Sequence, residues 1–425
     1  MMHEPSADRS GRSRRLLLIA TSRLIVLLAM GCAPALPSRA GSAFPGECAA
    51  FDSATVRTHL PDGRTVTVDQ RALVERDAGY LLLGDKTLVD TGPRLGLGQV
   101  NDARAIGALL DRRGVATLVP APPGIRYFEN PKILRADAGG ADVLWIDPDS
   151  TGTQLPRRSR LMTARFDGKS WGPVAMVADI PRLHEISQPT TFPGGVAVAI
   201  TEAGPNWALF IEVLIEQNGI WSRRRVLPEA HTPLYPFLLA RGSSWYLMFV
   251  GWDSADGNGL FIVRSNDAGS TWSSPYMVTA GSAYDPQLFT LGQGLALVWI
   301  GNHPRFGPRG VHLAFSGDGT HWTASSLFDA VNDSTIAATA IALDGNRLAL
   351  VRLIGESFEH TESLEIVSRT GREDILWTRQ LEALDPGLLI QDRTGAITLM
   401  TLGVTGNVSS PTPDPTLWMG RVRCE

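Results

Sequence analysis

Cysteine is scarce in this chain, whose 425 residues include only Cys32, Cys48 and Cys424. Three thiols cannot complete a four-cysteine zinc or iron–sulfur site, and their spacing matches no such signature. We therefore expect neither a metal nor any other cofactor.

An excess of positive charge is also missing. The chain holds 39 Lys and Arg residues against 43 Asp and Glu residues, which gives a formal net charge of −4. Proteins that bind nucleic acid concentrate basic side chains that displace counterions from phosphates, and no basic run of this kind occurs here. Nucleic acid is therefore not expected among the partners.

One long apolar run occurs, and it lies near the N-terminus. Residues 16–30 are mostly apolar and follow a segment that contains Arg9, Arg12, Arg14 and Arg15, the order of a secretory signal. Leu28-Ala29-Met30-Gly31-Cys32 approximates a bacterial lipobox. We interpret 1–31 as a lipoprotein signal peptide, Cys32 as the acylated residue and 32–47 as a linker. The mature protein is then a membrane-anchored lipoprotein on the periplasmic or extracellular face. Ordinary secretion and a retained anchor remain alternatives.

Tryptophan recurs at nearly fixed intervals. Steps of 50, 51, 50 and 55 residues separate five tryptophans that each close a short polar turn, Trp171, Trp221, Trp272, Trp322 and Trp377. A self-similar period of about 40 to 50 residues is typical of a β-propeller, in which each repeat is one blade. The period therefore predicts the architecture.

Hairpin patterns allow the blades to be counted. An apolar strand, a tight turn and a second apolar strand occur six times, beginning at Lys132, Thr190, Phe237, Leu288, Ala340 and Leu388. Their Gly- and Asn-containing turns supply the positive φ that a tight hairpin requires. We predict an all-β fold, a six-bladed β-propeller over 48–425 with four-stranded antiparallel blades in 131–425.

Two of the polar turns share a motif. The first comprises Ser265, Asp267, Gly269 and Trp272 in the pattern S-x-D-x-G-x-T-W, and the second comprises Ser316, Asp318 and Trp322 in a shortened form. These turns resemble the Asp-box, or BNR, repeat of the sialidase superfamily. In that family the Asp box joins the third and fourth strands on the face opposite the active site. The resemblance implies that these residues are structural.

Residues 48–130 precede the first clear repeat. They contain strand-like runs at 65–68 and 80–83, and a pattern at 102–113 that predicts a short helix capped by Asn101. One of these strands, or 116–119, is expected to complete the sixth blade. Because a closed ring brings its ends together, we also expect a disulfide between Cys48 and Cys424, with two free thiols as the alternative.

A functional site is expected on the face where inner strands begin and second strands connect to third strands, because propellers gather side chains about the axis there. The inner-strand candidates are Lys132, Glu185, Gln188, Tyr235, Asp285 and Gln287, and the principal loop candidates are Asp149, Asp253, Arg305 and Arg309. Paired carboxyl groups are what glycoside hydrolysis requires. We take Asp149, Glu185, Tyr235 and Asp285 as catalytic candidates, and Lys132, Asp253, Arg305 and Arg309 as ligand-binding candidates.

The resemblance to sialidases implies a more specific chemistry. Those enzymes use a Tyr nucleophile activated by Glu, an Asp acid/base and three arginines that bind the substrate carboxylate. The corresponding candidates here are Tyr235 or Tyr284 as the tyrosine with Glu185, and Asp149 as the acid/base. Lys132 stands where the family has the arginine of its Arg-Ile-Pro motif. Three hypotheses follow: a propeller that binds glycans or hydrolyses glycosides, a non-catalytic scaffold for a surface protein assembly, and a true exo-sialidase.

Overall fold

The computed structural model divides the chain into two units, Met1–Phe44 and Pro45–Glu425, and every described residue lies in the second unit. The described residues are 52–56, 58–59, 65–68, 72–84, 87–89, 98–100, 106–112, 115–125, 128–148, 158–204, 208–227, 232–253, 257–302, 309–323, 326–327, 335–343, 346–355, 360–368, 371–383, 387–405 and 414–423. These residues form β-strands and connections, with no α-helix among them. Within them, no helix is long and apolar enough to cross a membrane.

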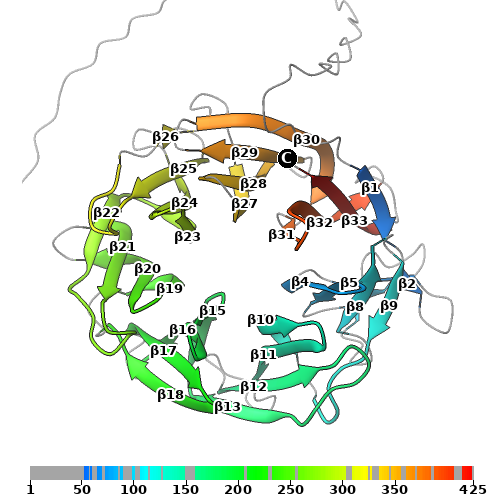
Figure 1. Ribbon diagram of the computed structural model, residues 1–425, viewed down its shortest axis with the longest axis horizontal. Helices are drawn as coiled ribbons and strands as arrows, with labels where there is room; N and C mark the ends of the chain where they lie inside the picture. Colours follow the sequence, from blue (N-terminus) through cyan, green and yellow to red (C-terminus); the bar gives the residue numbers. More distant parts are fainter. Residues whose placement is uncertain are drawn as a thin grey trace, which may run out of the picture. The chain divides into compact units, whose positions relative to one another are not determined.

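Seven antiparallel blades form a propeller (Figure 1), and the last two of them are joined in one eight-stranded sheet. Blade 1 comprises, from inside to outside, β4 (Ala72–Arg76), β5 (Gly79–Leu83), β8 (Gly107–Asp111) and β9 (Ala116–Val119). Blade 2 comprises β10 (Glu129–Asp137), β11 (Gly140–Pro148), β12 (Ser159–Phe166) and β13 (Ala175–Ile180). In blade 3, β14 (Leu183–Ile186) and β15 (Thr190–Phe192) share the inner position, followed by β16 (Gly195–Ala203), β17 (Leu209–Gln217) and β18 (Ile220–Arg225).

The remaining four blades follow the same order. Blade 4 comprises β19 (Leu234–Arg241), β20 (Ser244–Asp253), β21 (Gly257–Ser265) and β22 (Tyr276–Ala280), and blade 5 comprises β23 (Ala283–Leu291), β24 (Gly294–Asn302), β25 (Arg309–Ser316) and β26 (Ser326–Leu327). Blade 6 comprises β27 (Thr335–Leu343), β28 (Arg347–Ile354), β29 (His360–Ser368) and β30 (Gly371–Ala383). Blade 7 comprises β31 (Leu388–Gln391), β32 (Ala396–Thr405), β33 (Asp414–Arg423) and, as its outer strand, β1 (Asp52–Val56).

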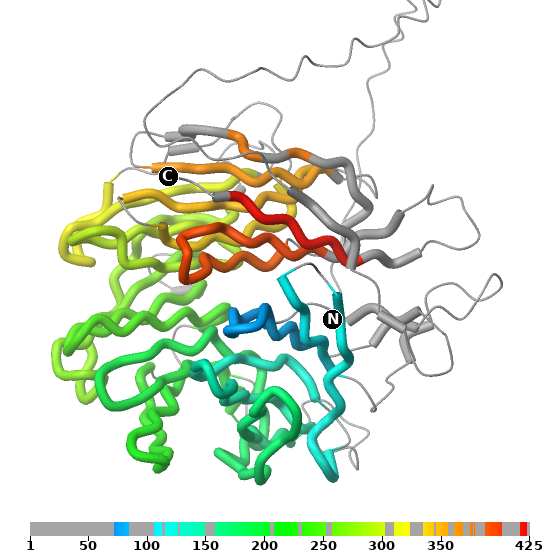
Figure 2. Tube along the Cα trace, turned by 45° about the vertical axis from the view of Figure 1, so that its right-hand side comes forward, coloured from blue at the N-terminus to red at the C-terminus, as the bar shows by residue number. Residues whose placement is uncertain are grey.

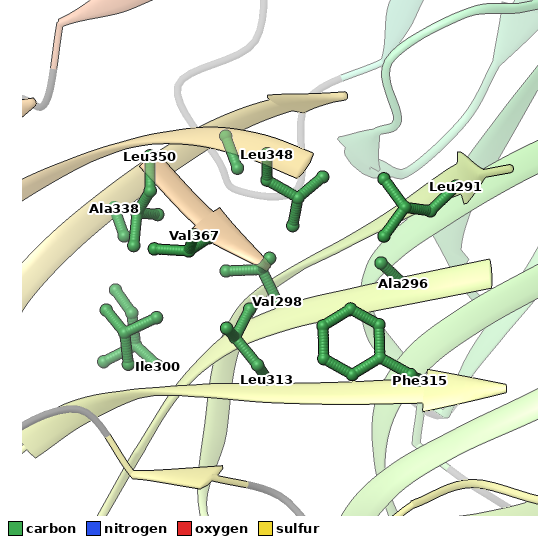
Figure 3. Close-up of a cluster of buried hydrophobic side chains, with 12 residues drawn as sticks. Leu291, Ala296, Val298, Ile300, Leu313, Phe315, Ala338, Leu348, Leu350 and Val367 are labelled. Atoms are coloured by element: carbon green, nitrogen blue, oxygen red, sulfur yellow. The ribbon is translucent and has the colours of Figure 1, made fainter. Parts of the chain in front are cut away.

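Apolar cores between neighbouring blades stabilise this arrangement. Seven buried clusters each join two consecutive blades, including one that joins blade 7 to blade 1. Figure 3 shows the cluster between blades 5 and 6, where Val298 and Phe315 of one sheet face Ala338 and Leu350 of the next. Because a pleated strand presents alternate residues to its two faces, each blade contributes to two cores. The cores therefore form a closed cycle.

The ring closes in blade 7. Strand β1 pairs with β33, from Asp52 opposite Arg421 to Val56 opposite Leu417. Inner strands β31 and β4 are neighbours across the seam, where the red C-terminal strands lie beside the blue strand β4 in Figure 2. The hydroxyls of Tyr80 and Thr398 lie 2.9 Å apart in a buried hydrogen bond between blades 1 and 7. Pairing of an early strand with a late one thus completes the last blade.

The prediction of six blades was wrong, because the structure has seven. The missed blade is blade 1, which lacks a tryptophan turn and whose second and third strands are separated by an insertion. That insertion contributes β6 (Thr87–Val89) and β7 (Gly98–Val100) to a separate small sheet with β2 (Thr58–His59) and β3 (Thr65–Val68). The insertion hides the hairpin-plus-strand pattern that identified the other blades.

The prediction of a helix at 102–113 was also wrong where that range is described. Residues Gly107–Asp111 form β8, which pairs with β5 and β9. Ala108, Leu109 and Leu110 have good helix propensity, but pairing on both sides and burial of Ala108 and Leu110 override it. The closing strand does come from the segment before the repeats, although it is β1 rather than any of the three runs considered.

The tryptophan period follows five consecutive blades. Trp171, Trp272 and Trp322 lie between the third and outer strands of blades 2, 4 and 5, while Trp221 and Trp377 lie within outer strands β18 and β30. Each therefore belongs to a different sheet. The position they share explains why a spacing of about one blade length is visible in the sequence.

The turn at 265–272 is held by its own side chains. The Asp267 carboxylate accepts hydrogen bonds from the Thr271 hydroxyl at 2.7 Å and the Thr271 backbone N–H at 2.8 Å, and Ser265 Oγ accepts from the Gly269 N–H at 2.8 Å. The two bonds from Thr271, together with one from the Ser265 hydroxyl, lower the pKa of Asp267 to about 2. Asp318 makes equivalent bonds, and its pKa is also lowered by hydrogen bonds from His321 and Thr320. Both carboxylates are structural elements of turns that join third strands to outer strands.

Candidate functional site

A cavity of about 770 Å³ lies where the inner strands of the blades meet. Every blade contributes to its lining, which comprises Ala72, Leu73, Asn130, Lys132, Ile133, His184, Glu185, Ile186, Ser187, Gln188, Pro189, Tyr235, Pro236, Phe237, Asp285, Pro286, Gln287, Phe289, Thr339, Ala340, Ile341, Leu388 and Leu389. The cavity is therefore axial. All six of the inner-strand candidates line it.

Glu185 is the carboxyl group of the cavity with the most distinctive environment. Its side chain is 22% exposed, and its carboxylate accepts a hydrogen bond from the backbone N–H of Tyr235 in the next blade. His184 Nδ1 lies 3.6 Å from Glu185 Oε1. Burial raises the pKa of Glu185, outweighing the hydrogen bond from Tyr235 and the nearby His184, and the charge of Asp285 adds to the increase. Glu185 can therefore hold a proton at a higher pH than an ordinary glutamate.

Tyr235 and Asp285 interact electrostatically with Glu185. Burial raises the pKa of Tyr235, and the negative charges of Glu185 and Asp285 raise it further. The three groups come from blades 3, 4 and 5 and interact across the cavity wall. A phenol with a raised pKa remains protonated at neutral pH, so Tyr235 is set to donate a hydrogen bond rather than to act as a phenolate.

Other lining residues have packing roles as well as access to the cavity. The Gln287 amide donates to the Ala338 carbonyl and accepts from the Ala340 N–H, both at 2.9 Å, so it links blades 5 and 6. Lys132 lines the cavity but is only 8% exposed. The rings of Phe237 and Phe289 lie 6.4 Å apart and add an apolar surface to the same wall.

The loop candidates do not join the described lining. Asp149 and Arg305 lie outside the described residues. Asp253 ends β20 opposite Gly257, and Arg309 begins β25 opposite Asn302, so their backbones lie at the ends of strands on the axial face. The described lining of the cavity includes neither of them. Their assignment to ligand binding remains a prediction.

Two further carboxylates near these strand ends, Asp147 and Glu202, are engaged in ion pairs on the blades. Asp147 accepts from Arg160 at 2.6 Å, and Glu202 pairs with Arg223, which also contacts Glu212. Asp147 and Arg160 lie on neighbouring strands, whereas Glu202 and Arg223 lie on strands either side of β17 in one sheet. In the described part of the chain, no group of three or more His, Cys, Asp or Glu residues has the arrangement of a metal site.

Sequence reasoning missed one feature of the lining. Asn130, Tyr235 and Asp285 have φ values of 48°, 51° and 47°, and each directly precedes a proline. In blade 3, Gln188-Pro189 also lines the cavity, but it lies between β14 and β15, and Gln188 is not among the described residues with positive φ. A repeated residue-proline pair at the start of inner strands is visible in the sequence, and it identifies Asn130 as a position equivalent to Tyr235 and Asp285.

Comparison with known proteins gives likeness of fold only. No family model matches the chain. No curated protein matches it either. Among solved structures, it is similar to a protein of unknown function from Dyadobacter fermentans at 16% identity and a TM-score of 0.46, covering 69% of this chain and 94% of that one. It is also similar to an α-L-arabinanase from Penicillium chrysogenum complexed with arabinobiose, at 12% identity and 0.45, covering 68% and 92%. The Trypanosoma rangeli sialidase matches at 10% identity and 0.43, covering 74% and 57%.

Proposed function

We propose that this propeller binds a saccharide in its axial cavity and hydrolyses a glycosidic bond there, with Glu185 as the proton donor. The observation that carries this proposal is a pair of carboxyl groups in unlike surroundings, a half-buried Glu185 with a raised pKa and an exposed Asp285 whose charge acts on it. Glycoside hydrolysis commonly uses two carboxyl groups, one held as the acid and the other charged.

The chemical roles follow from these environments. Protonated Glu185 donates its proton to the glycosidic oxygen as the bond from that oxygen to the anomeric carbon breaks. Ionised Asp285 stabilises the positive charge that develops at the anomeric carbon. Water then adds to this carbon, and the proton it releases restores Glu185. Tyr235 donates a hydrogen bond to the substrate, and Phe237 and Phe289 give the apolar face of the sugar ring a surface to pack on.

The cavity also suits a saccharide in size. Pockets for small ligands commonly measure about 300 to 1,000 Å³, so a volume of about 770 Å³ admits more than one sugar ring. Lys132 supports a second candidate function, that of an exo-sialidase, because a buried ammonium group in the lining can pair with a substrate carboxylate. In that case the lysine takes the place of one sialidase arginine.

A parallel screen of chromogenic glycosides and a glycan array tests the proposal. We expect the wild-type protein to hydrolyse or bind at least one neutral glycoside, and Asp267→Ala to retain this behaviour because Asp267 lies in a turn at the opposite ends of the strands. Hydrolysis confined to sialosides would identify an exo-sialidase. A protein that neither binds nor hydrolyses any member of either set is a non-catalytic scaffold, and the proposal is then wrong.

We further propose that the chain belongs to the sialidase superfamily with Asp-box turns, and that it is a lipoprotein on the periplasmic or extracellular face. Cys32, Cys48 and Cys424 lie outside the described residues, so lipidation of Cys32 and the disulfide between Cys48 and Cys424 remain predictions. A non-reduced digest in which the peptides of Cys48 and Cys424 migrate separately would exclude that disulfide.

Lipidation predicts a change of compartment. The Cys32→Ser variant should move from the membrane to the soluble fraction, because acyl chains anchor a protein far more strongly than peripheral contacts do. Fractionation with a salt wash measures this. A variant that stays in the washed membrane pellet would indicate a retained N-terminal anchor instead.

A further inference from the structure

Three inner strands open with the same unusual backbone. Asn130, Tyr235 and Asp285 adopt positive φ, a region that residues other than glycine rarely occupy, and each stands before a proline. At each place two residues of the inner strand oppose a single residue of the second strand, Trp145, Phe249 or Trp299. These are β-bulges, which change the direction in which a side chain points.

The two residues of each bulge differ in how exposed they are. Pro131, Pro236 and Pro286 are buried, while Tyr235 and Asp285 are exposed and Asn130 is half-buried. All of these residues except Pro131 line the cavity. Proline has no N–H to donate to the neighbouring strand, so it suits the unpaired place in a bulge. The proline therefore anchors the strand while the preceding residue is presented to the cavity. Strain of this kind persists where the surrounding fold imposes it, and it is concentrated at functional sites.

Tyr235 and Asp285 already belong to the proposed catalytic group, whose third member is Glu185. The remaining residue that a bulge presents, Asn130, comes from blade 2, two residues before Lys132. Its side chain makes no hydrogen bond to any residue in the described part of the chain. An amide offers both a donor and an acceptor, which suits adjacent hydroxyl groups of a sugar.

We infer that Asn130 is a further ligand-binding residue, and that its bulge with Pro131 positions the amide to bind saccharide hydroxyl groups from the blade next to the one that bears Glu185. This inference rests on the proposed function of the axial cavity. It assigns to blade 2 a role in substrate binding without a role in proton transfer. The expected effect of losing the amide is therefore on KM rather than on kcat.

Two substitutions separate binding from backbone strain. Asn130→Gly removes the amide but accepts positive φ without strain, so its Tm should equal or exceed that of the wild type. Asn130→Ala removes the amide and keeps the strain, so its Tm should be no higher than that of the wild type. Both should bind the saccharide about tenfold more weakly and raise KM by a similar factor, with kcat within about twofold of the wild type.

The measurements are titration with a saccharide that the wild type binds, kinetics with the corresponding aryl glycoside, and thermal unfolding. If the wild type binds a saccharide and both variants bind it equally well, Asn130 has only a structural role and this inference is overturned while the proposed function stands. If the wild type binds no saccharide, the proposed function and this inference fail together. Loss of kcat without a change in KM would also overturn it, because Asn130 would then act in the chemical step.

Discussion

Replacement of Glu185 by glutamine is expected to slow glycoside hydrolysis by about 10²- to 10⁴-fold while saccharide affinity changes by no more than a fewfold. Glutamine preserves the size of the side chain and can still accept the hydrogen bond from the Tyr235 N–H. It cannot donate a proton to a leaving oxygen. Rates with an aryl glycoside and titrations with the matching saccharide measure the two effects separately.

The pH dependence of the rate provides a sharper test of the same role. A general acid must be protonated, so the rate should fall as pH rises through the raised pKa of Glu185. The negative charge of Asp285 contributes to raising that pKa, so Asp285→Asn should lower it and move the alkaline limb of the profile to lower pH. Asp267→Ala is the control, and its alkaline limb should not move. An unchanged limb in Asp285→Asn, or full activity in Glu185→Gln, would contradict the assignment.

Removal of β1 should have the largest effect on stability. A chain that begins at Arg57 lacks the strand whose five residues pair with β33, and so exposes one edge of blade 7. At about 1 kcal/mol for each lost backbone hydrogen bond, the free energy of unfolding should fall by several kcal/mol. We expect Tm to fall by about 10 °C and soluble yield to drop, since a long unpaired edge promotes aggregation.

The comparison requires two control chains. A chain that begins at Pro45 retains β1, and the same chain with Cys48→Ser removes any contribution of a disulfide to Cys424. If the loss of Tm in the chain that begins at Arg57 is reproduced by Cys48→Ser alone, the covalent link rather than strand pairing closes the ring. A Tm within about 2 °C of that of the Pro45 chain would show that blade 7 is stable with three strands.

The sequence predicted the class of fold because each blade between blades 2 and 6 carries a tryptophan at a similar place. It did not predict blade 1, because the second and third strands of that blade are separated by the insertion that bears β6 and β7. The segment Ala108, Leu109 and Leu110 favoured a helix because its intrinsic propensity is helical. Pairing with β9 and with β5, which lies before the insertion, makes it β8, and the pattern within the segment does not contain that information.

The candidate site was predictable in part for a similar reason. Topology places the starts of inner strands about the axis, so Glu185, Tyr235 and Asp285 could be selected from their positions along the chain. Their environments could not be predicted in this way, because the raised pKa of Glu185 depends on burial and on the charge of Asp285, two blades away. The positive φ of Asn130 was equally hidden, although the proline that follows it was a visible sign.

The seam of the ring and the proposed catalytic group occupy different blades. Glu185, Tyr235 and Asp285 lie in blades 3, 4 and 5, whereas β1 completes blade 7 and the apolar cluster that closes the cycle joins blade 7 to blade 1. Native-state fluctuations that detach β1 would therefore expose amides of blade 7 to hydrogen exchange while blades 3, 4 and 5 keep their cores. Local opening at the seam would leave the proposed catalytic group assembled.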